Sequence, residues 1–370
     1  MKIVINAFSA RIGGAQTYLL NLLNNLPGNF PLEIHIFAPR KLVLPIHDSI
    51  KRIYTKFPTE NPILRAFWEI FLLPFYLRNE KADILFCPGG LNFTLAPASC
   101  KVISMFRNMM PFDKSLITKM PLNPQKIRNI LIKRFILFTL FHSDLVIFIS
   151  KYARDLILEK IKIKNYLVIP HGIPKNFYKS SKNIKRPILA PYGKYIIYVS
   201  RFDIYKHHIN LINAFANIPI KLRNDLSLVF IGETNLPEFQ HVQKLIQNLK
   251  LENKIRIIGA IPYSDLPGWY QNAESIVFAS SCENCPNILM EALASGRPVL
   301  SSNVMPMPEF GGNKIQYFSP FDTNDITQAI IKIHSNKKFA DYVAKAAFAQ
   351  SLLFKLENQA NKTWKAIISL

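Results

Sequence analysis

The sequence predicts an α/β protein made of two doubly wound domains, each with a parallel sheet. A chain of 370 residues is long for one hydrophobic core, which stops growing at roughly 250–300 residues. Short β-branched and apolar runs alternate with longer helical patterns, as expected for parallel strands that are covered on both faces. The alternation occurs twice, and a polar, basic, proline-containing segment lies between the two series.

Each series of strands defines one predicted domain. The first domain, residues 1–178, contains predicted strands at 2–6, 32–37, 83–86, 101–104 and 145–149. Residues 179–192 are predicted as the linker. The second domain, residues 193–350, contains predicted strands at 194–199, 226–231, 254–258, 275–278 and 298–301. Ligands of open α/β sheets bind beyond the carboxyl ends of the strands, so we expect a site in a cleft between the two domains.

Composition and charge restrict the function classes. Lys and Arg number 46 against 24 Asp and Glu, a net charge of +22 that favours phosphate-bearing partners: nucleotides, anionic lipid or nucleic acid. The amino terminus does not resemble a signal peptide, and residues 66–77 are shorter than the roughly 20 residues of a bilayer span, so we expect a cytoplasmic protein. Cys282 and Cys285 have no second close pair of zinc ligands, so no metal is expected.

One acidic stretch, SCENCPNILMEALASGRPVL at residues 281–300, follows a predicted strand. Pro286 suits the first turn of a helix that Gly296 closes. Glu283 then lies in the loop before the helix, and Glu291 about one turn inside it. A helix N-terminus favours a phosphate or a carboxylate. The alternative is that Glu283 is only a cap or charge partner of the helix.

A basic pair follows the first strand of the second domain. Arg201 and Lys206 fall in the loop between the strand at 194–199 and a helix predicted near His208. Fixed cations there can stabilise the negative charge that develops on a departing diphosphate, without a metal ion. The alternative is a pair of solvated loop cations in a basic chain.

Four motifs in order resemble the retaining family 4 glycosyltransferases of the GT-B fold. They are Gly13-Gly14 after the first strand, Ser-Arg-Phe-x-x-x-Lys at 200–206, Gly232-Glu233 after a middle strand, and Glu-Asn-x-Pro-x-x-x-x-Glu-Ala-x-Ala-x-Gly-x-Pro-Val at 283–299. The resemblance runs from about residue 2 to residue 322. It implies two Rossmann-like domains facing a cleft and a C-terminal helix, within 351–370, that braces the first domain.

The activity that the resemblance implies is transfer of a sugar, with retention, from a nucleotide-sugar donor to a glycan or lipid-linked saccharide. The pathway would be lipopolysaccharide, O-antigen or capsule synthesis, with neither metal nor cofactor. Arg201 and Lys206 match the diphosphate pair, Glu283 the acid facing the donor sugar, and Glu291 the acid that binds the ribose; Arg201, Lys206 and Glu283 are the expected catalytic residues. The expected donor-binding residues are Gly13, Gly14, Arg201, Lys206, Gly232, Tyr263, Glu283, Asn284, Cys285, Pro286, Asn287 and Glu291. The backbone amides from Asn284 to Asn287 would hold the sugar and the distal phosphate.

The sequence departs from the family pattern at two places. Arg107 and Asn108, on the expected acceptor side, stand where many members carry a His-Asp pair, and neither is a general base at neutral pH. In a front-face mechanism the departing phosphate accepts the acceptor proton instead. His207 stands where glycine is usual, so that turn is expected to differ, and His171 is expected to pack at the hinge.

The basic residues of the first domain favour a membrane surface as partner. Residues 114–143 contain six Lys or Arg and no acid, and Ile127, Ile130, Leu131 and Arg134 follow a helical stride. With the aromatic run around Trp68, they predict peripheral binding to the anionic inner face of the plasma membrane. The alternative is a solvated basic face on a buried helix.

Two other functions remain open from the sequence. A nucleotide-sugar epimerase of the same fold would need several carboxylates and a His around the sugar, but only Glu283 is well placed. A non-catalytic basic protein bound to membrane or nucleic acid would leave the pairing of the two cations with the two acids unexplained. No aromatic-rich nucleic-acid motif occurs, so nucleic acid is not an expected partner.

Overall fold

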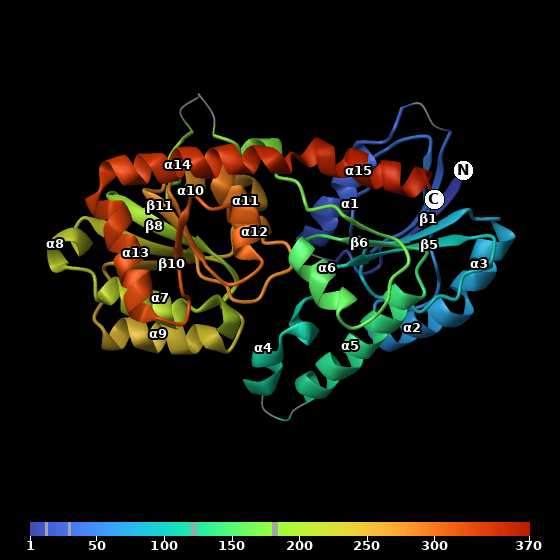
Figure 1. Ribbon diagram of the computed structural model, residues 1–370, viewed down its shortest axis with the longest axis horizontal. Helices are drawn as coiled ribbons and strands as arrows, with labels where there is room; N and C mark the ends of the chain where they lie inside the picture. The colour runs from blue at the N-terminus through green and yellow to red at the C-terminus, as the bar shows by residue number, and fades with distance from the viewer. Residues whose placement is uncertain (12–13, 29–30, 120–121, 123, 180–183) are drawn as a thin grey trace. The chain divides into compact units, whose positions relative to one another are not determined.

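The computed structural model describes residues 1–370 except 12–13, 29–30, 120–121, 123 and 180–183. Its contacts divide the chain into two compact units. The first unit contains Met1–Gly172 and Leu356–Leu370, and the second contains Ile173–Lys355. In this division the segment 179–192 falls inside the second unit. Each unit is an open parallel sheet with helices packed against it (Figure 1).

The first unit has a seven-stranded sheet in the order β3-β2-β1-β4-β5-β6-β7. Its strands are β1 (Lys2–Asn6), β2 (Glu33–Phe37), β3 (Ile50–Arg52), β4 (Ile84–Cys87), β5 (Lys101–Phe106), β6 (Leu145–Phe148) and β7 (Tyr166–Val168). Its helices are α1 (Gly14–Asn24), α2 (Pro62–Phe71), α3 (Leu73–Asn79), η1 (Met110–Phe112), α4 (Lys114–Lys119), α5 (Pro124–Phe141), α6 (Lys151–Leu158) and α15 (Leu356–Ile368).

The second unit has a six-stranded sheet in the order β10-β9-β8-β11-β12-β13. Its strands are β8 (Lys194–Val199), β9 (Leu226–Ile231), β10 (Ile255–Gly259), β11 (Ser275–Phe278), β12 (Val299–Ser302) and β13 (Gln316–Phe318). Its helices are η2 (Lys175–Phe177), η3 (Ile204–Lys206), α7 (His208–Ala216), α8 (Ile220–Arg223), α9 (Glu238–Asn248), η4 (Tyr263–Asp265), α10 (Leu266–Asn272), α11 (Asn287–Ala294), α12 (Met307–Gly311), α13 (Thr323–Ser335), α14 (Lys337–Ser351) and η5 (Leu352–Phe354).

The predicted doubly wound fold is confirmed. The central strands are continuous apolar runs because helices cover both faces of each sheet, and Ile3, Val4 and Ile5 of β1 are fully buried. All ten predicted strands are present within one or two residues of their expected ends. Three strands were not predicted: β3, β7 and β13, which have three residues each and lie at sheet edges.

The C-terminal helix α15 packs against α1 within the first unit. The indole of Trp364 is buried and donates a hydrogen bond to the Leu22 carbonyl at 2.8 Å. The side chain of Asn21 donates to Gln359 Oε1, also at 2.8 Å. Residues more than three hundred positions apart therefore share one core, which ties the end of the chain to the first helix.

Candidate active site

The Lys206 ammonium is buried beside the Glu283 carboxylate in the second unit. Lys206 ends η3, between β8 and α7, whereas Glu283 lies in the loop after β11. Lys206 Nζ is 2.5 Å from Glu283 Oε1, and the lysine side chain is only 8% exposed. It also lies 5.5 Å from the ring centroid of Phe278. Lysine is almost never buried unless it is paired, so Lys206 is not a solvated loop cation.

Arg201 differs from Lys206 in exposure. Its side chain is about half exposed, and Nη2 lies 3.5 Å from Asp203 Oδ2. Asp203 also caps η3, because its Oδ1 accepts a hydrogen bond from the Ile204 amide at 3.0 Å. Asp203 was not predicted as part of the site. The structure shows it as the residue that shapes the turn between Arg201 and Lys206.

Glu291 is buried on α11 with one oxygen bound and one orphaned. The Tyr263 hydroxyl donates to Glu291 Oε1 at 2.5 Å. Glu291 Oε2 has no hydrogen-bond partner among the described residues. Burial raises the pKa of Glu291 to about 8, and the Tyr263 hydrogen bond opposes that shift only in part. An orphaned buried oxygen is rare, so this atom is suited to form a hydrogen bond with a bound hydroxyl.

The raised pKa of Glu291 predicts a loss of stability as pH rises. Between about pH 4.5 and pH 8 the folded chain keeps the proton and the unfolded chain does not. The free energy of unfolding therefore falls with increasing pH, by up to about 1.4 kcal/mol per unit for this group. Glu291→Gln keeps the acceptor for Tyr263 and removes the titration. We expect urea unfolding from pH 5 to 9 to show wild type losing stability relative to Glu291→Gln. Parallel pH profiles of the two proteins would contradict this pKa assignment.

The start of α11 offers fewer free amides than expected. From the sequence, Pro286 was expected among the backbone donors. Pro286 is the N-cap residue and has no N–H group, so it cannot donate to a ligand. The Asn287 amide donates to the Cys285 carbonyl at 2.9 Å. The Asn287 side-chain oxygen is buried and has no hydrogen-bond partner in the described part of the chain. A backbone site at this helix start therefore has no N–H group at Pro286, and the Asn287 amide is already bonded within the turn.

Gly232 follows β9 and touches the loop that carries Arg201. Its φ is +158°, and a Cβ atom there would lie 2.0 Å from the Ser200 carbonyl oxygen. The Gly232 amide donates to the Gly259 carbonyl at 3.0 Å. The structure therefore requires glycine at this position for contact between two loops of the protein itself.

His207 has a left-handed backbone conformation. Glycine adopts this conformation without strain, which fits the family pattern of glycine at this position. The φ and ψ of His207 are 52° and 37°. Its Nε2 lies 2.8 Å from the hydroxyl of Ser281, a residue of the loop that carries Glu283. The histidine side chain therefore links the turn after Lys206 to the Glu283 loop, which a glycine cannot do.

The first unit contains the expected acceptor-side residues Arg107 and Asn108 and two of the expected donor-binding residues, Gly13 and Gly14. Gly13 lies outside the described residues, and Gly14 begins α1. The Arg107 guanidinium lies 5.5 Å from the ring centroid of the buried Tyr18, and Asn108 is exposed. The Tyr18 and His171 rings are 5.3 Å apart. Burial, with a smaller effect from Arg107, holds the pKa of His171 well below its usual value, so this histidine is neutral.

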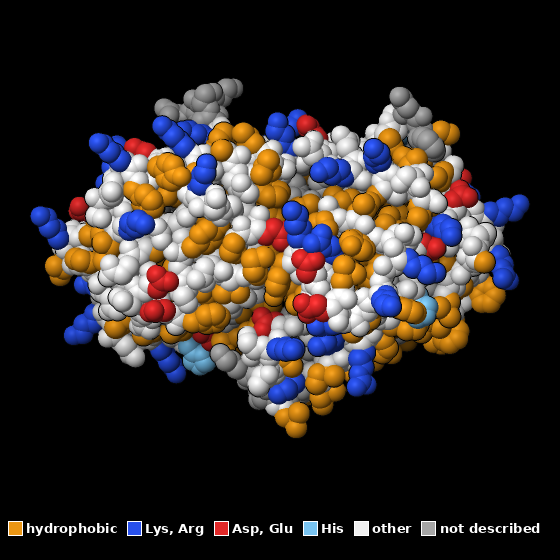
Figure 2. All heavy atoms as spheres, viewed as in Figure 1, with side chains coloured by type: hydrophobic (Ala, Val, Ile, Leu, Met, Phe, Trp, Pro, Cys, Tyr) orange, Lys and Arg blue, Asp and Glu red, His pale blue; other side chains and the backbone are white. Residues whose placement is uncertain are grey.

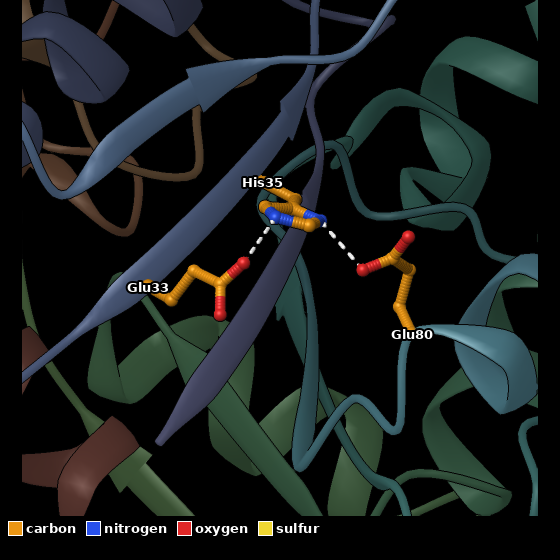
Figure 3. A group of neighbouring side chains, drawn as sticks. All are labelled: Glu33, His35 and Glu80. Atoms are coloured by element: carbon orange, nitrogen blue, oxygen red, sulfur yellow. Dashed lines mark hydrogen bonds and ion pairs between the residues drawn. The ribbon is translucent and has the colours of Figure 1, made fainter.

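One group of potential metal ligands occurs among the described residues, at Glu33, His35 and Glu80 (Figure 3). The Lys2 ammonium already lies 3.2 Å from Glu33 and 2.8 Å from Glu80. The Tyr76 hydroxyl lies 2.6 Å from His35 Nδ1. Lys2 and Glu33 begin their strands, at the opposite end from the carboxyl edge. Lys2 bridges the two carboxylates and Tyr76 engages His35, so the group is an internal ion-pair and hydrogen-bond network and does not fit a metal site.

The two halves of the chain match two family descriptions. Residues 12–177 match Glycosyltransferase Family 4, and residues 180–350 match Glycosyl transferases group 1. The chain is a family 4 glycosyltransferase. Among solved structures, this glycosyltransferase resembles sucrose-phosphate synthase from Thermosynechococcus elongatus, with a TM-score of 0.76, 18% identity and coverage of 99% and 98% of the two chains. It also resembles WaaG, a glycosyltransferase of lipopolysaccharide biosynthesis, with a TM-score of 0.74, 12% identity and 99% coverage of both chains. These similarities confirm the GT-B fold.

Two curated relatives are bacterial glycosyltransferases. The O-antigen chain mannosyltransferase B of Escherichia coli is 26% identical over 234 residues, 60% of either chain. The N-acetylgalactosamine-N,N'-diacetylbacillosaminyl-diphospho-undecaprenol 4-alpha-N-acetylgalactosaminyltransferase of Campylobacter jejuni is 28% identical over 319 residues. That alignment covers 82% of this chain and 80% of the relative. The chain thus spans less than two thirds of the length of the first relative and more than two thirds of the length of the second.

Proposed function

We propose that this glycosyltransferase moves a sugar, with retention, from a nucleotide-sugar donor to a lipid-linked saccharide or glycan during synthesis of a bacterial surface polysaccharide. The observation that carries the proposal is the pairing of the buried Lys206 with the partly buried Glu283, built from two loops at the carboxyl edge of one sheet. The names of the O-antigen and diphospho-undecaprenol relatives support the pathway and the acceptor class.

The proposed donor contacts follow from the geometry of the second unit. Lys206 has three N–H donors, of which Glu283 accepts one, so the others can bind the diphosphate. Arg201 adds a second, more exposed cation. Glu283 Oε2 can accept from a sugar hydroxyl, and the orphaned Glu291 Oε2 can form a hydrogen bond with a ribose hydroxyl. These cations stabilise the charge that develops on the leaving diphosphate, and no step calls on a metal.

The acceptor proton is proposed to go to the departing diphosphate. Arg107 stays protonated at neutral pH, and Asn108 does not titrate. His171 is neutral but 6% exposed, with its Nδ1 buried, which disfavours a role as a base for a soluble or membrane-bound acceptor. A front-face reaction on one side of the sugar accounts for retention without a separate general base.

A nucleotide screen tests the proposed function. We expect one nucleotide family among UDP, GDP, dTDP and CMP, with its sugar conjugates, to raise the melting temperature of the wild-type protein. No shift with any of them would overturn the donor site. Conversion of the donor sugar without an acceptor would identify an epimerase. Salt-sensitive nucleic-acid binding that nucleotides do not compete would identify a non-catalytic binding protein.

The first unit has an apolar and basic face that we propose binds an anionic membrane. No helix among the described residues is long and apolar enough to cross a bilayer. Exposed apolar side chains gather on α2, α3 and α5 instead, beside Lys and Arg (Figure 2). They are Ile63, Leu64, Phe67, Ile70, Phe71, Leu72, Phe75, Ile127, Ile130, Leu131, Phe135, Phe138 and Phe141. Their exposure disfavours the alternative of a buried helix with a solvated basic side.

The aromatic part of the membrane prediction was centred on the wrong residue. Trp68 is buried, and its ring packs against Phe8 and Phe37 at centroid distances of 5.3 and 4.8 Å. Its neighbour Phe67 and the later Phe71 are exposed instead. Residues 67 and 71 share one face of α2 because they are four apart, whereas residue 68 points to the core.

Serine at two exposed positions of α5 is expected to weaken membrane binding. Ile127→Ser/Leu131→Ser removes apolar surface without touching a buried residue. We expect about tenfold weaker sedimentation with vesicles of phosphatidylethanolamine and phosphatidylglycerol, because each side chain contributes by the apolar area it buries in the interface. The matched control, Ile220→Ser/Leu353→Ser, changes two exposed apolar residues of the second unit. Equal binding by the two variants would contradict the assigned face.

A further inference from the structure

A pocket of about 570 Å³ lies in the first unit and contains none of the donor residues assigned to the second unit. Its lining follows three neighbouring parallel strands at their carboxyl ends. Arg11 lies between β1 and α1, Arg40 and Lys41 follow β2, and Lys56 follows β3. This edge of an open α/β sheet is where ligands bind, and the volume is that of a small-molecule site.

The pocket is strongly basic. Four cations, Arg11, Arg40, Lys41 and Lys56, line it together with one acid, Glu60. Arg40, Lys41 and Lys56 form no ion pair with any residue in the described part of the chain. Their positive charge is therefore not neutralised within the protein. A ligand with more than one negative charge, such as a phosphate or diphosphate ester, complements this lining.

Hydrogen bonds to backbone carbonyls hold the basic loops in place. Arg52 Nη1 donates to the carbonyls of Pro39 at 3.1 Å and Arg40 at 3.4 Å, and Nη2 donates to that of Leu42. The Arg11 guanidinium likewise donates to the Thr59 and Glu60 carbonyls. Arg52 acts as a positioning residue for the segment with Arg40 and Lys41.

One wall of the pocket is aromatic and continues into the proposed membrane face. Phe57 lines the pocket and stacks on Phe67 with ring centroids 5.8 Å apart and planes 12° from parallel. Phe67 in turn contacts Phe71 at 4.6 Å, and both belong to the exposed face of α2. Basic and apolar surfaces therefore adjoin, which suits a ligand with an anionic head and a hydrocarbon chain.

We propose that this pocket binds the phosphate or diphosphate of a lipid-linked acceptor. Arg40, Lys41 and Lys56 would hold the anionic group, and the lipid chain would leave past Phe57 toward Phe67. The proposal rests on the proposed function and adds the part of the acceptor that is recognised. A free phosphate or diphosphate carries the same charged group without the chain, so the test compares both sources.

Replacing two of the pocket cations tests the site. The probe is geranyl diphosphate, with binding followed by isothermal titration calorimetry. Arg40→Gln/Lys41→Gln changes two exposed side chains, so the fold is expected to remain intact. We expect at least about tenfold weaker binding, since two charge-assisted contacts are lost. The control Lys337→Gln/Lys338→Gln has the same net charge and changes two exposed lysines of α14. Equal affinity of the two variants would overturn the proposal.

Two further titrations identify the source of the ligand and separate this site from the donor site. If inorganic pyrophosphate binds more weakly than geranyl diphosphate, the result supports a lipid-linked ligand. If the two bind equally well, the result overturns the proposal of a lipid-linked ligand. If Arg40→Gln/Lys41→Gln loses binding to phosphatidylglycerol vesicles but keeps its affinity for geranyl diphosphate, the two cations bind the membrane surface. That result also overturns the proposal of a lipid-linked ligand in the pocket. Nucleotide binding that persists while geranyl diphosphate fails to bind wild type would refute the pocket alone. Failure of every nucleotide would refute the proposed function instead.

Discussion

Lys206→Met is expected to reduce sugar transfer by about 10²–10³-fold, because it removes a fixed positive charge from the leaving diphosphate. Methionine keeps much of the length and the apolar stem of lysine, so the rings of Tyr205 and Phe278 keep their packing partner. The charge interacts most strongly once the bond to the diphosphate breaks. We therefore expect a larger fall in kcat than in donor affinity, measured by steady-state transfer and by direct titration of the donor.

A second variant separates the catalytic effect from a loss of stability. Lys206→Met leaves the partly buried Glu283 carboxylate without its cation, which destabilises the fold. Lys206→Met/Glu283→Gln removes both charges, so we expect it to recover much of the stability, measured by urea unfolding, but none of the transfer. Recovery of transfer in the double variant would contradict the assigned role of Lys206 and leave the pair as a structural ion pair.

The central strands of both sheets could be predicted from the sequence, and three edge strands could not. Strands such as β1 and β8 are buried on both faces, so their apolar runs stand out from their surroundings. β3, β7 and β13 are only three residues long and pair on one side. Three residues are too few to show an apolar pattern that distinguishes a strand from a loop. The conformation of these segments depends on pairing with the neighbouring strand.

The motifs predict which loops would carry the proposed donor site, but not how its side chains pair. Glu283 and Lys206 are 77 positions apart, and only the fold brings them to 2.5 Å. Tyr263 was expected only as a donor-binding residue, and the structure adds that its hydroxyl donates to the Glu291 carboxylate. Such contacts depend on side-chain direction at the ends of three different strands. The residues next to each position in the sequence do not determine that direction.

Some errors could have been avoided from the sequence itself. Pro286 has no amide hydrogen, so its place among the backbone donors conflicted with its chemistry from the start. Positions 67 and 71 share one face of a helix and position 68 points elsewhere, so the aromatic run there does not form a single surface. Both properties belong to single positions and not to the whole stretch of residues.

Gly232→Ala is expected to disturb the donor site through the backbone. The added Cβ would lie 2.0 Å from the Ser200 carbonyl oxygen and 3.0 Å from the Arg201 amide nitrogen, so the loop that carries Arg201 must move. A displacement near 1 Å at a positioning loop can cost about 10²-fold in rate. We also expect a loss of about 2–4 kcal/mol in the free energy of unfolding, because the close contact is with backbone that cannot rotate away.

Gly193→Ala is the matched control for that variant. An added Cβ at Gly193, just before β8, meets only the Asp225 carbonyl oxygen at 4.0 Å, an ordinary contact. We expect it to change stability by less than about 1 kcal/mol and to leave transfer intact. If Gly232→Ala unfolds at a lower urea concentration but the folded variant binds donor as wild type does, the glycine serves packing alone. If donor binding falls with Arg201 and Lys206 still present, the contact between the two loops is what positions the cations.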